Sequence, residues 1–407
     1  MLTDIALIVL FALILNFLFL KIQLPGILGM IITGVILGPS LLNLIDASVI
    51  DLLREFKTVA LIVILIRAGL GIKKSTLNMI GGPAIRMGFV PCVIEGVTVL
   101  ILSHYILGFS IIEAGMLGFI FAAVSPAVVV PSMLALKDKG FGKHKEVPTL
   151  VLAGASVDDV FAITIFGVFT GLATGTAVNV PYLIVSVPMG IILGALIGAG
   201  LGYLLVWYFK KVHIRDTKKV IIFMIFAVAF YEFTELEAVK HYVHLAGLLG
   251  IMAIGFVILD KYPKLANRLA VKFNKVWVLA EILLFVYIGA ELDISNINGQ
   301  MMGVGLLILF IGLLLRSGGV WLSLIGSNLN AKEKLFCMIA YWPKATVQAA
   351  IGAVPLTLIQ EGVITNSSIE AGQTILALAV LSIVVSAPLG AIGISLTGKR
   401  LLTQDVN

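Results

Sequence analysis

The chain has 407 residues, of which 60% are apolar and only 12% charged, and its formal net charge is +6. Soluble domains contain about 25% charged and 45–50% apolar residues, so this composition excludes both a water-soluble fold and a disordered chain. The apolar segments run for about 20 residues, as membrane-spanning helices require, and lack the short alternating pattern of barrel strands. The sequence therefore predicts an all-α polytopic membrane protein.

Apolar segments follow one another along the whole chain, and about 13 of them are predicted to be transmembrane helices. Their expected ranges are 2–20, 25–39, 57–71, 86–108, 111–135, 146–171, 181–208, 219–236, 242–259, 276–292, 301–326, 333–356 and 371–397. No basic stretch precedes the first segment, so we expect a retained span rather than a cleaved signal peptide. Cys92 and Cys337 lie inside apolar segments, where buried thiols are expected instead of a disulfide.

Basic residues gather in every second connection between the predicted spans. Clusters within 137–145 and 210–219 alternate with connections whose basic residues are Arg54, Lys57 and Lys240. Because basic connections remain in the cytoplasm, we expect a multi-pass protein of the cell membrane (plasma or inner) with the N-terminus outside and the C-terminus cytoplasmic. The positive charge then reflects topology in lipid, and no nucleic-acid partner is expected.

Asp158 and Asp159 lie near the middle of the sixth predicted span, roughly 18–20 Å from its cytoplasmic end at 1.5 Å per residue. A charge at that depth costs at least about 2.5–3.5 kcal/mol and marks a functional site. Adjacent side chains on a helix point about 100° apart. This argues against an intramembrane aspartyl protease, whose carboxylates face each other across a shared proton. We therefore expect an ion- and proton-binding site, not an enzyme.

Three further charges inside the predicted spans are expected to support this site. Glu95 and Arg316 both lie roughly 14–15 Å from the cytoplasmic side, so we expect an ion pair that lowers the cost of burying each charge. Lys344 lies near mid-membrane in the twelfth span, and we expect it to pair with Asp158.

Two predicted spans are interrupted near mid-membrane, at Ser125-Pro126 and at Pro343. Proline removes a backbone donor and frees a carbonyl group, and such gaps survive in a bilayer only where they line a cavity within the protein. The breaks occupy corresponding places in the fourth-to-sixth and eleventh-to-thirteenth spans, which enter the membrane from opposite sides. Such inverted repeats are typical of transporters with alternating access.

Several motifs are distributed along the chain from about residue 24 to 400. They include Arg67-Ala68-Gly69-Leu70, Ala123-Val124-Ser125-Pro126-Ala127, Val147-Pro148-Thr149-Leu150, Asp158-Asp159 and Trp342-Pro343-Lys344-Ala345-Thr346-Val347-Gln348. Together they resemble the monovalent cation:proton antiporter superfamily, the sodium/hydrogen exchanger family. The branch they resemble most is the double-aspartate one that includes the animal-type Na⁺/H⁺ antiporters.

The resemblance implies an inverted-repeat antiporter fold with two crossing discontinuous helices, and a homodimer in which a transport core moves against a scaffold. Residues 1–80 and 211–298 would form the dimerisation scaffold, residues 173–210 a linker helix, and residues 81–172 and 299–400 the two repeats of the core. The resemblance also implies that Asp158 and Asp159 carry the ion and the proton, without a cofactor. Many double-aspartate relatives have lysine where this chain has Arg316, which leaves the stoichiometry open.

We expect a secondary active antiporter that exchanges Na⁺ or Li⁺ for H⁺ by alternating access. Asp159 is expected to be the main ligand, because hard cations prefer oxygen and burial penalises an unpaired carboxylate. Its expected helpers are Asp158, Thr346, Ser156, Ser125 and the carbonyl groups freed near Ser125. The alternatives are a K⁺/H⁺ exchanger of the same fold and a non-transporting membrane sensor.

Overall fold

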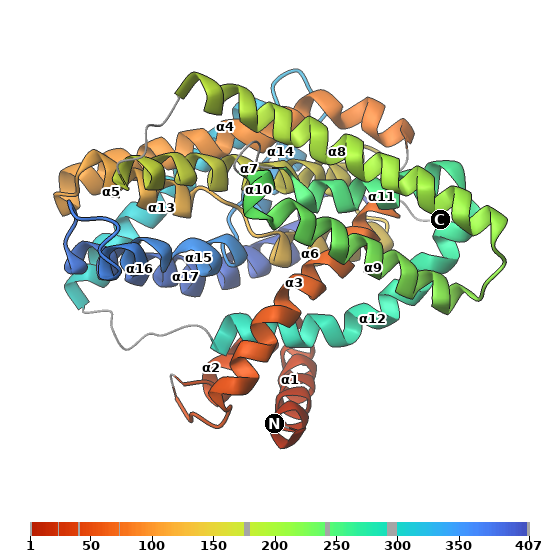
Figure 1. The fold of residues 1–407 in the computed structure, drawn as a ribbon, viewed down its shortest axis with the longest axis horizontal. Helices are drawn as coiled ribbons and strands as arrows, with labels where there is room; N and C mark the ends of the chain where they lie inside the picture. Colours follow the sequence, from red (N-terminus) through yellow and green to blue (C-terminus); the bar gives the residue numbers. More distant parts are fainter. Residues whose placement is uncertain are drawn as a thin grey trace.

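The computed structural model describes residues 2–22, 24–39, 41–72, 74–174, 180–240, 245–290 and 299–404, and builds them almost entirely from α-helices (Figure 1). The helices are α1 (Leu2–Lys21), α2 (Gly26–Leu37), α3 (Ala47–Gly69), α4 (Lys74–Leu107), α5 (Ile111–Phe121), α6 (Pro126–Asp138), α7 (Val147–Ala173), α8 (Val180–Lys211), α9 (Asp216–Glu235), α10 (Glu237–Lys240), α11 (Gly247–Lys261), α12 (Pro263–Ala290), α13 (Gly299–Ser323), α14 (Ala331–Ala340), α15 (Thr346–Ile351), α16 (Val354–Gln360) and α17 (Ile369–Leu401).

The helical membrane fold is confirmed, although several helices are longer than the predicted spans. Helix α3 begins at Ala47 and α4 at Lys74, each about three turns before the apolar segment that predicted it. Hydropathy detects the part of a helix that lies in lipid, whereas the helix itself continues through polar turns. Within the described residues, seven helical segments are long and apolar enough to cross a membrane. The total of thirteen spans stays a prediction.

The two predicted breaks are present, and they meet. Helix α5 ends at Phe121 before α6 begins at Pro126, and α14 ends at Ala340 before α15 begins at Thr346. The backbone N–H of Ser125, in the first break, donates a hydrogen bond of 2.8 Å to the carbonyl oxygen of Pro343, in the second. The discontinuous helices therefore cross at their extended segments, as the family resemblance implied.

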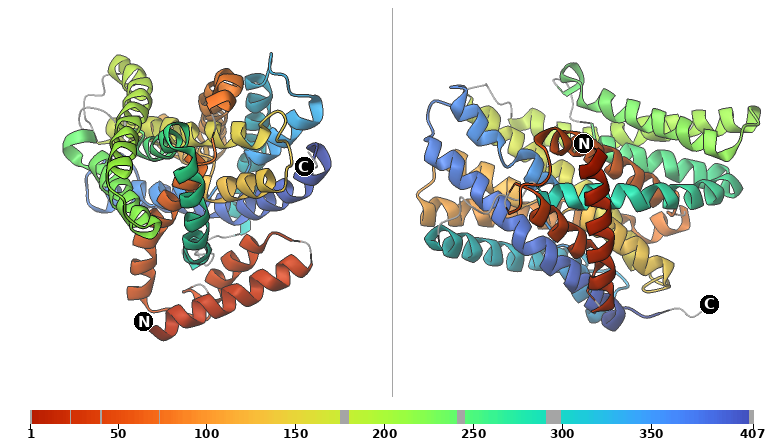
Figure 2. Two further views of the ribbon diagram at one scale, coloured as in Figure 1. Left: turned by 90° about the vertical axis from the view of Figure 1, so that its right-hand side faces the viewer. Right: turned by 90° about the horizontal axis from the view of Figure 1, so that it is seen from below.

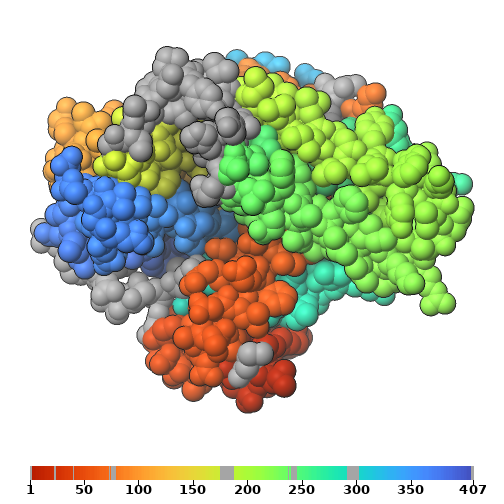
Figure 3. Space-filling view, in the orientation of Figure 1, coloured from red at the N-terminus to blue at the C-terminus, as the bar shows by residue number. Residues whose placement is uncertain are grey.

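The helices form two groups on either side of an apolar interface. The crossing group comprises α4–α7 and α13–α17, and the flanking group comprises α1–α3, α8, α9, α11 and α12. In Figure 1, α5 and α15–α17 lie to the left and α9 and α11 to the right, while α8 and α12 run from left of centre to the right. Figure 3 shows the same division on the surface. Small and β-branched side chains of the crossing group pack into the hydrophobic core of the flanking group, among them Val128, Val130, Ala345 and Ala387. Such contacts have no directional preference.

Packing along this interface is incomplete at α2. An apolar cavity of about 280 Å³ lies between α2 and α17, and its lining includes Ile31, Val35, Ile383 and Ala387. Helix α1 lies at the edge of the molecule beside α2 (Figure 2), and Ile8 and Ala12 are its buried residues. The remaining apolar surface of α1 faces outward, as expected of a helix in lipid.

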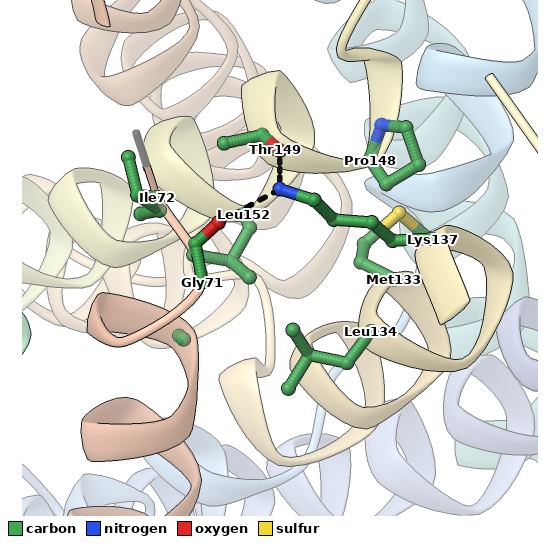
Figure 4. A pocket seen from close by; sticks show the side chains of 9 residues that line it. Gly71, Ile72, Met133, Leu134, Lys137, Pro148, Thr149 and Leu152 are labelled. Atoms are coloured by element: carbon green, nitrogen blue, oxygen red, sulfur yellow. Dashed lines mark hydrogen bonds between the residues drawn. The ribbon is translucent and has the colours of Figure 1, made fainter. Parts of the chain in front are cut away.

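Lys137 of α6 links the two groups by a polar contact (Figure 4). Its Nζ donates to the carbonyl oxygen of Gly71 at 3.0 Å and to Oγ1 of Thr149 at 2.9 Å, and lies 3.2 Å from Oε2 of Glu146. An ammonium group has three N–H donors, so each has an acceptor. Gly71 follows the end of α3, where the helix dipole is negative and attracts a cation.

Candidate functional site

Asp158 and Asp159 lie in the interior of the crossing group, with 0% and 5% of their surfaces exposed. Oδ2 of Asp158 accepts hydrogen bonds from the backbone N–H of Val124 and from Nη2 of Arg316, each at 2.9 Å. Oδ1 of Asp158 and Oδ1 of Asp159 are buried and have no hydrogen-bond partner among the described residues. A buried acceptor without a donor is costly, so both atoms are suited to receive a cation or a proton.

Arg316 on α13 joins the broken helices to α4 and α7. It is fully buried, and its Nη1 donates to Oε2 of Glu95 at 2.8 Å and to the carbonyl oxygen of Ala122. Its Nε donates to the carbonyl oxygen of Tyr341 at 2.9 Å. The predicted ion pair between Glu95 and Arg316 is confirmed, and the same guanidinium also binds Asp158.

The expected pairing of Lys344 with Asp158 is wrong. Nζ of Lys344 lies 2.7 Å from Oε1 of Glu95 and donates to the carbonyl oxygen of Phe121. Glu95 thus lies between two cations, one on each of its oxygens, and Asp158 takes its cation from Arg316. The reason is geometric. Arg316 contacts both Glu95 and Asp158, so Oε1 is the oxygen of Glu95 that remains for Lys344.

The four interacting charges cancel, and Asp159 lies outside them. Glu95 and Asp158 supply two negative charges, and Arg316 and Lys344 supply two positive charges. All four side chains are 0% exposed. Within the described part of the chain, no ion pair involves Asp159. As a carboxylate it would therefore add an uncompensated charge to a closed interior, which is costly unless a cation or proton joins it.

The carbonyl groups near Ser125, expected as ion ligands, are occupied by side-chain donors instead. Ile120 and Ala123 accept from Nε2 of Gln348 at 2.9 Å each, while Phe121 and Ala122 accept from Lys344 and Arg316. The last carbonyl groups of a helix have no partner within it and form the negative end of its dipole. They attract donors, so at these four positions the expectation of free ligands is wrong.

Of the three hydroxyl groups predicted as ligands, two lie together at the helix crossing and the third lies on α7. Oγ of Ser125 and Oγ1 of Thr346 lie 3.5 Å apart, so the helix crossing brings these two residues together. Ser156 lies on α7 one turn before Asp159, and its hydroxyl donates to the carbonyl oxygen of Leu152 at 2.9 Å. All three side chains are buried. Their roles as ligands remain predictions.

Two polar residues at the crossing were not assigned a role from the sequence. Gln348 caps the end of α5, and Oγ of Ser386 on α17 accepts the backbone N–H of Lys344 at 3.1 Å. Both lie among mostly apolar residues, and this was the signal that the sequence offered. Polarity alone does not reveal which backbone group such a side chain binds.

Comparison with known proteins identifies the family. The model of the family described as sodium/hydrogen exchanger, transmembrane, matches residues 6–400. The chain is 36% identical over 355 residues to sodium/hydrogen exchanger 9B2 of Xenopus tropicalis, covering 86% of this chain and 64% of that protein. It is 34% identical over 387 residues to sodium/hydrogen exchanger 9B2 of Homo sapiens, covering 94% and 70%. The chain thus spans about two thirds of the length of these relatives.

A solved structure shows the same fold. The sodium proton antiporter MjNhaP1 from Methanocaldococcus jannaschii superposes with a TM-score of 0.76 at 19% identity, over 98% of each chain. The relatives are consistent with the animal-type branch, and the family resemblance seen in the motifs is confirmed. Since the family model matches nearly all of the sequence, the chain belongs to the sodium/hydrogen exchanger family of integral membrane antiporters.

Proposed function

We propose that the protein exchanges Na⁺ or Li⁺ for H⁺ at Asp158 and Asp159 by alternating access. The observation that carries this proposal is the buried Oδ1 of Asp159, which has no hydrogen-bond partner among the described residues and lies beside a cluster whose own charges cancel. A carboxylate in that setting needs one positive charge. A cation and a proton each supply it, and they compete because each neutralises the same group.

The neighbouring groups have distinct parts in this scheme. Asp159 exchanges the ion and the proton, while Asp158 is oriented by Arg316 and Val124 and offers its Oδ1 to the ion. The hydroxyl groups of Ser125, Thr346 and Ser156 are proposed to complete the oxygen shell that a hard cation prefers. Glu95, Arg316 and Lys344 support the site by balancing charge.

Alternating access requires one part of the protein to move against another. We assign residues 81–172 and 299–400 to a moving core, residues 1–80 and 211–298 to a dimerisation scaffold, and residues 173–210 to a linker helix. The apolar interface and the cavity between α2 and α17 support this assignment, because sliding there breaks few directional contacts. Moving the core across the low-dielectric barrier would be costly while Asp159 is charged and has no ion bound. The core therefore moves only with Na⁺ or H⁺ bound, and this requirement couples the two fluxes.

Homodimer formation and orientation in the membrane belong to the same proposal. The homodimer rests on the resemblance to the family. Placement in the cell membrane, with the N-terminus outside and the C-terminus cytoplasmic, rests on the alternation of basic connections. Membrane lipid then surrounds the outward apolar faces of helices such as α1.

The test is the dissipation of a pH gradient in proteoliposomes on addition of Na⁺, Li⁺ or K⁺, with and without a clamped voltage. We expect rapid dissipation with Na⁺ and Li⁺ and little with K⁺. Dissipation by K⁺ alone would make the protein a K⁺/H⁺ exchanger, and no ion-dependent flux would favour a sensor. Dependence on the clamped voltage would reveal whether the exchange moves net charge.

A further inference from the structure

Gln348 on α15 is held rigidly at the helix crossing. Its side chain is buried, with 1% of its surface exposed, and Nε2 donates to the carbonyl oxygens of Ile120 and Ala123, each at 2.9 Å. A primary amide has two N–H groups, and both are used here. Rotating the amide by 180° would place its oxygen against two carbonyl oxygens, so the observed orientation is the favoured one.

One peptide group connects this amide to the aspartate pair. The carbonyl of Ala123 accepts from Gln348, and the N–H of Val124 donates to Oδ2 of Asp158. These two groups belong to the same planar trans peptide unit, in which C=O and N–H point in opposite directions. Gln348 and Asp158 therefore hold the two sides of a single peptide plane, in the extended segment where the α5 helix no longer fixes it.

We propose that Gln348 is a positioning residue of the ion site, which acts through the Ala123–Val124 peptide to set the orientation of the Asp158 carboxylate. This inference rests on the proposed function. Without the amide, the peptide plane is free to rotate and the N–H of Val124 leaves Asp158. Arg316 then holds the Asp158 carboxylate alone, the position of the Oδ1 atom offered to the ion is less well fixed, and ion affinity falls.

Gln348 is also the neutral member of the set that caps the end of α5. Arg316 and Lys344 carry charges, so removing either upsets the charge balance of the buried cluster, and a loss of transport would say little about positioning. Gln348 has no ion pair to lose. Its replacement therefore isolates the effect of the peptide plane.

The test compares Gln348→Leu and Gln348→Asn with the wild type in proteoliposomes, with Gln360→Leu as the control because Gln360 is exposed at the end of α16. Leucine removes both hydrogen bonds, and asparagine is one methylene too short to reach both carbonyl groups. We expect the KM for Na⁺ to rise about tenfold for leucine and less for asparagine, while the maximal rate changes by less than about threefold. Gln360→Leu should behave as the wild type.

Na⁺-dependent thermal stabilisation of each purified variant provides a second readout, because it measures binding without transport. An unchanged KM with an unchanged Na⁺ stabilisation would overturn the proposal, as would a loss confined to the maximal rate. If Gln348→Leu does not fold, Gln348→Asn decides by the same measurements. Failure of the proposed function would look different, since the wild type itself would then show neither Na⁺-driven proton flux nor Na⁺ stabilisation.

Discussion

Arg316 binds Asp158 through one carboxylate oxygen only, with Nη2 2.9 Å from Oδ2, and Oδ1 has no hydrogen-bond partner in the part of the chain that the structure describes. The same Oδ2 also accepts the N–H of Val124. A guanidinium stays protonated at physiological pH, so this arginine holds the carboxylate in place without supplying a proton to the cycle. Under the proposed function, we expect the exchanged proton to be carried by Asp159, the carboxyl group that lies outside the charge-balanced cluster.

Replacing Asp159 with asparagine is expected to abolish exchange. The amide is nearly isosteric but cannot release a proton or neutralise a cation, so the site can no longer exchange Na⁺ for H⁺. Proteoliposomes containing Asp159→Asn should keep a pH gradient after Na⁺ is added. Asp138→Asn, at an exposed aspartate at the end of α6, is the matched control and should transport normally. Coupled flux through the Asp159 variant would show that the ion binds elsewhere.

Replacing Arg316 with methionine is expected to lower the stability of the protein by about 3–5 kcal/mol, because Asp158 would remain buried without its cation while Glu95 would keep only Lys344. Thermal unfolding in detergent measures the loss. Adding Asp158→Asn to the same chain removes the orphaned charge and should recover part of it. Arg268→Met provides the comparison, since Arg268 is half exposed in its pair with Asp216 and such surface pairs contribute about 0–1 kcal/mol. Equal losses for Arg316 and Arg268 would contradict the prediction.

The sequence predicted the parts of the site that depend on depth in the membrane. Counting residues placed Glu95 and Arg316 at one level, and their contact followed. Depth is one coordinate, however, and it does not say which of several charges at similar levels are lateral neighbours. Lys344 was therefore assigned to Asp158, although packing brings it to Glu95.

The side chains that cap the carbonyl groups at the end of α5 could not be predicted for a related reason. Proline at 126 and 343 predicts that carbonyl groups near the breaks lose their partners, but the sequence does not show which donors arrive from the other repeat. Three side chains far away along the chain cap the end of α5, and the packing of α13 against α4 and of α15 against α5 brings them there. The helix breaks were predictable, whereas the contacts between them required the structure.

Competition at one carboxyl group predicts how pH affects Na⁺ transport. Lowering the pH increases the fraction of Asp159 that carries a proton, so more Na⁺ is needed to displace it. The apparent KM for Na⁺ should rise by up to about tenfold for each pH unit in the range where the group is protonated, with little change in the maximal rate. Initial rates at several Na⁺ concentrations and pH values test this. A maximal rate that falls with pH while KM stays constant would indicate separate sites for the two ions.

The contact of Lys137 with Gly71 predicts a conformational effect of Lys137→Met. Methionine keeps an apolar chain of similar length but removes the donors that join α6 to the end of α3. A hydrogen bond from a partly exposed ammonium contributes about 1 kcal/mol. The population of the conformation in which α6 contacts the end of α3, relative to other conformations, should therefore fall about fivefold.

A short cross-linker between cysteines introduced at Ala68 and Leu152, which line one cavity across the interface, measures this change through its yield. The yield should fall with Lys137→Met and stay unchanged with Lys143→Met, at an exposed lysine of the connection that follows α6. An equal yield in both variants would mean that apolar packing alone holds the two groups together, and that Lys137 serves only to bind Glu146 and Thr149 within the crossing group.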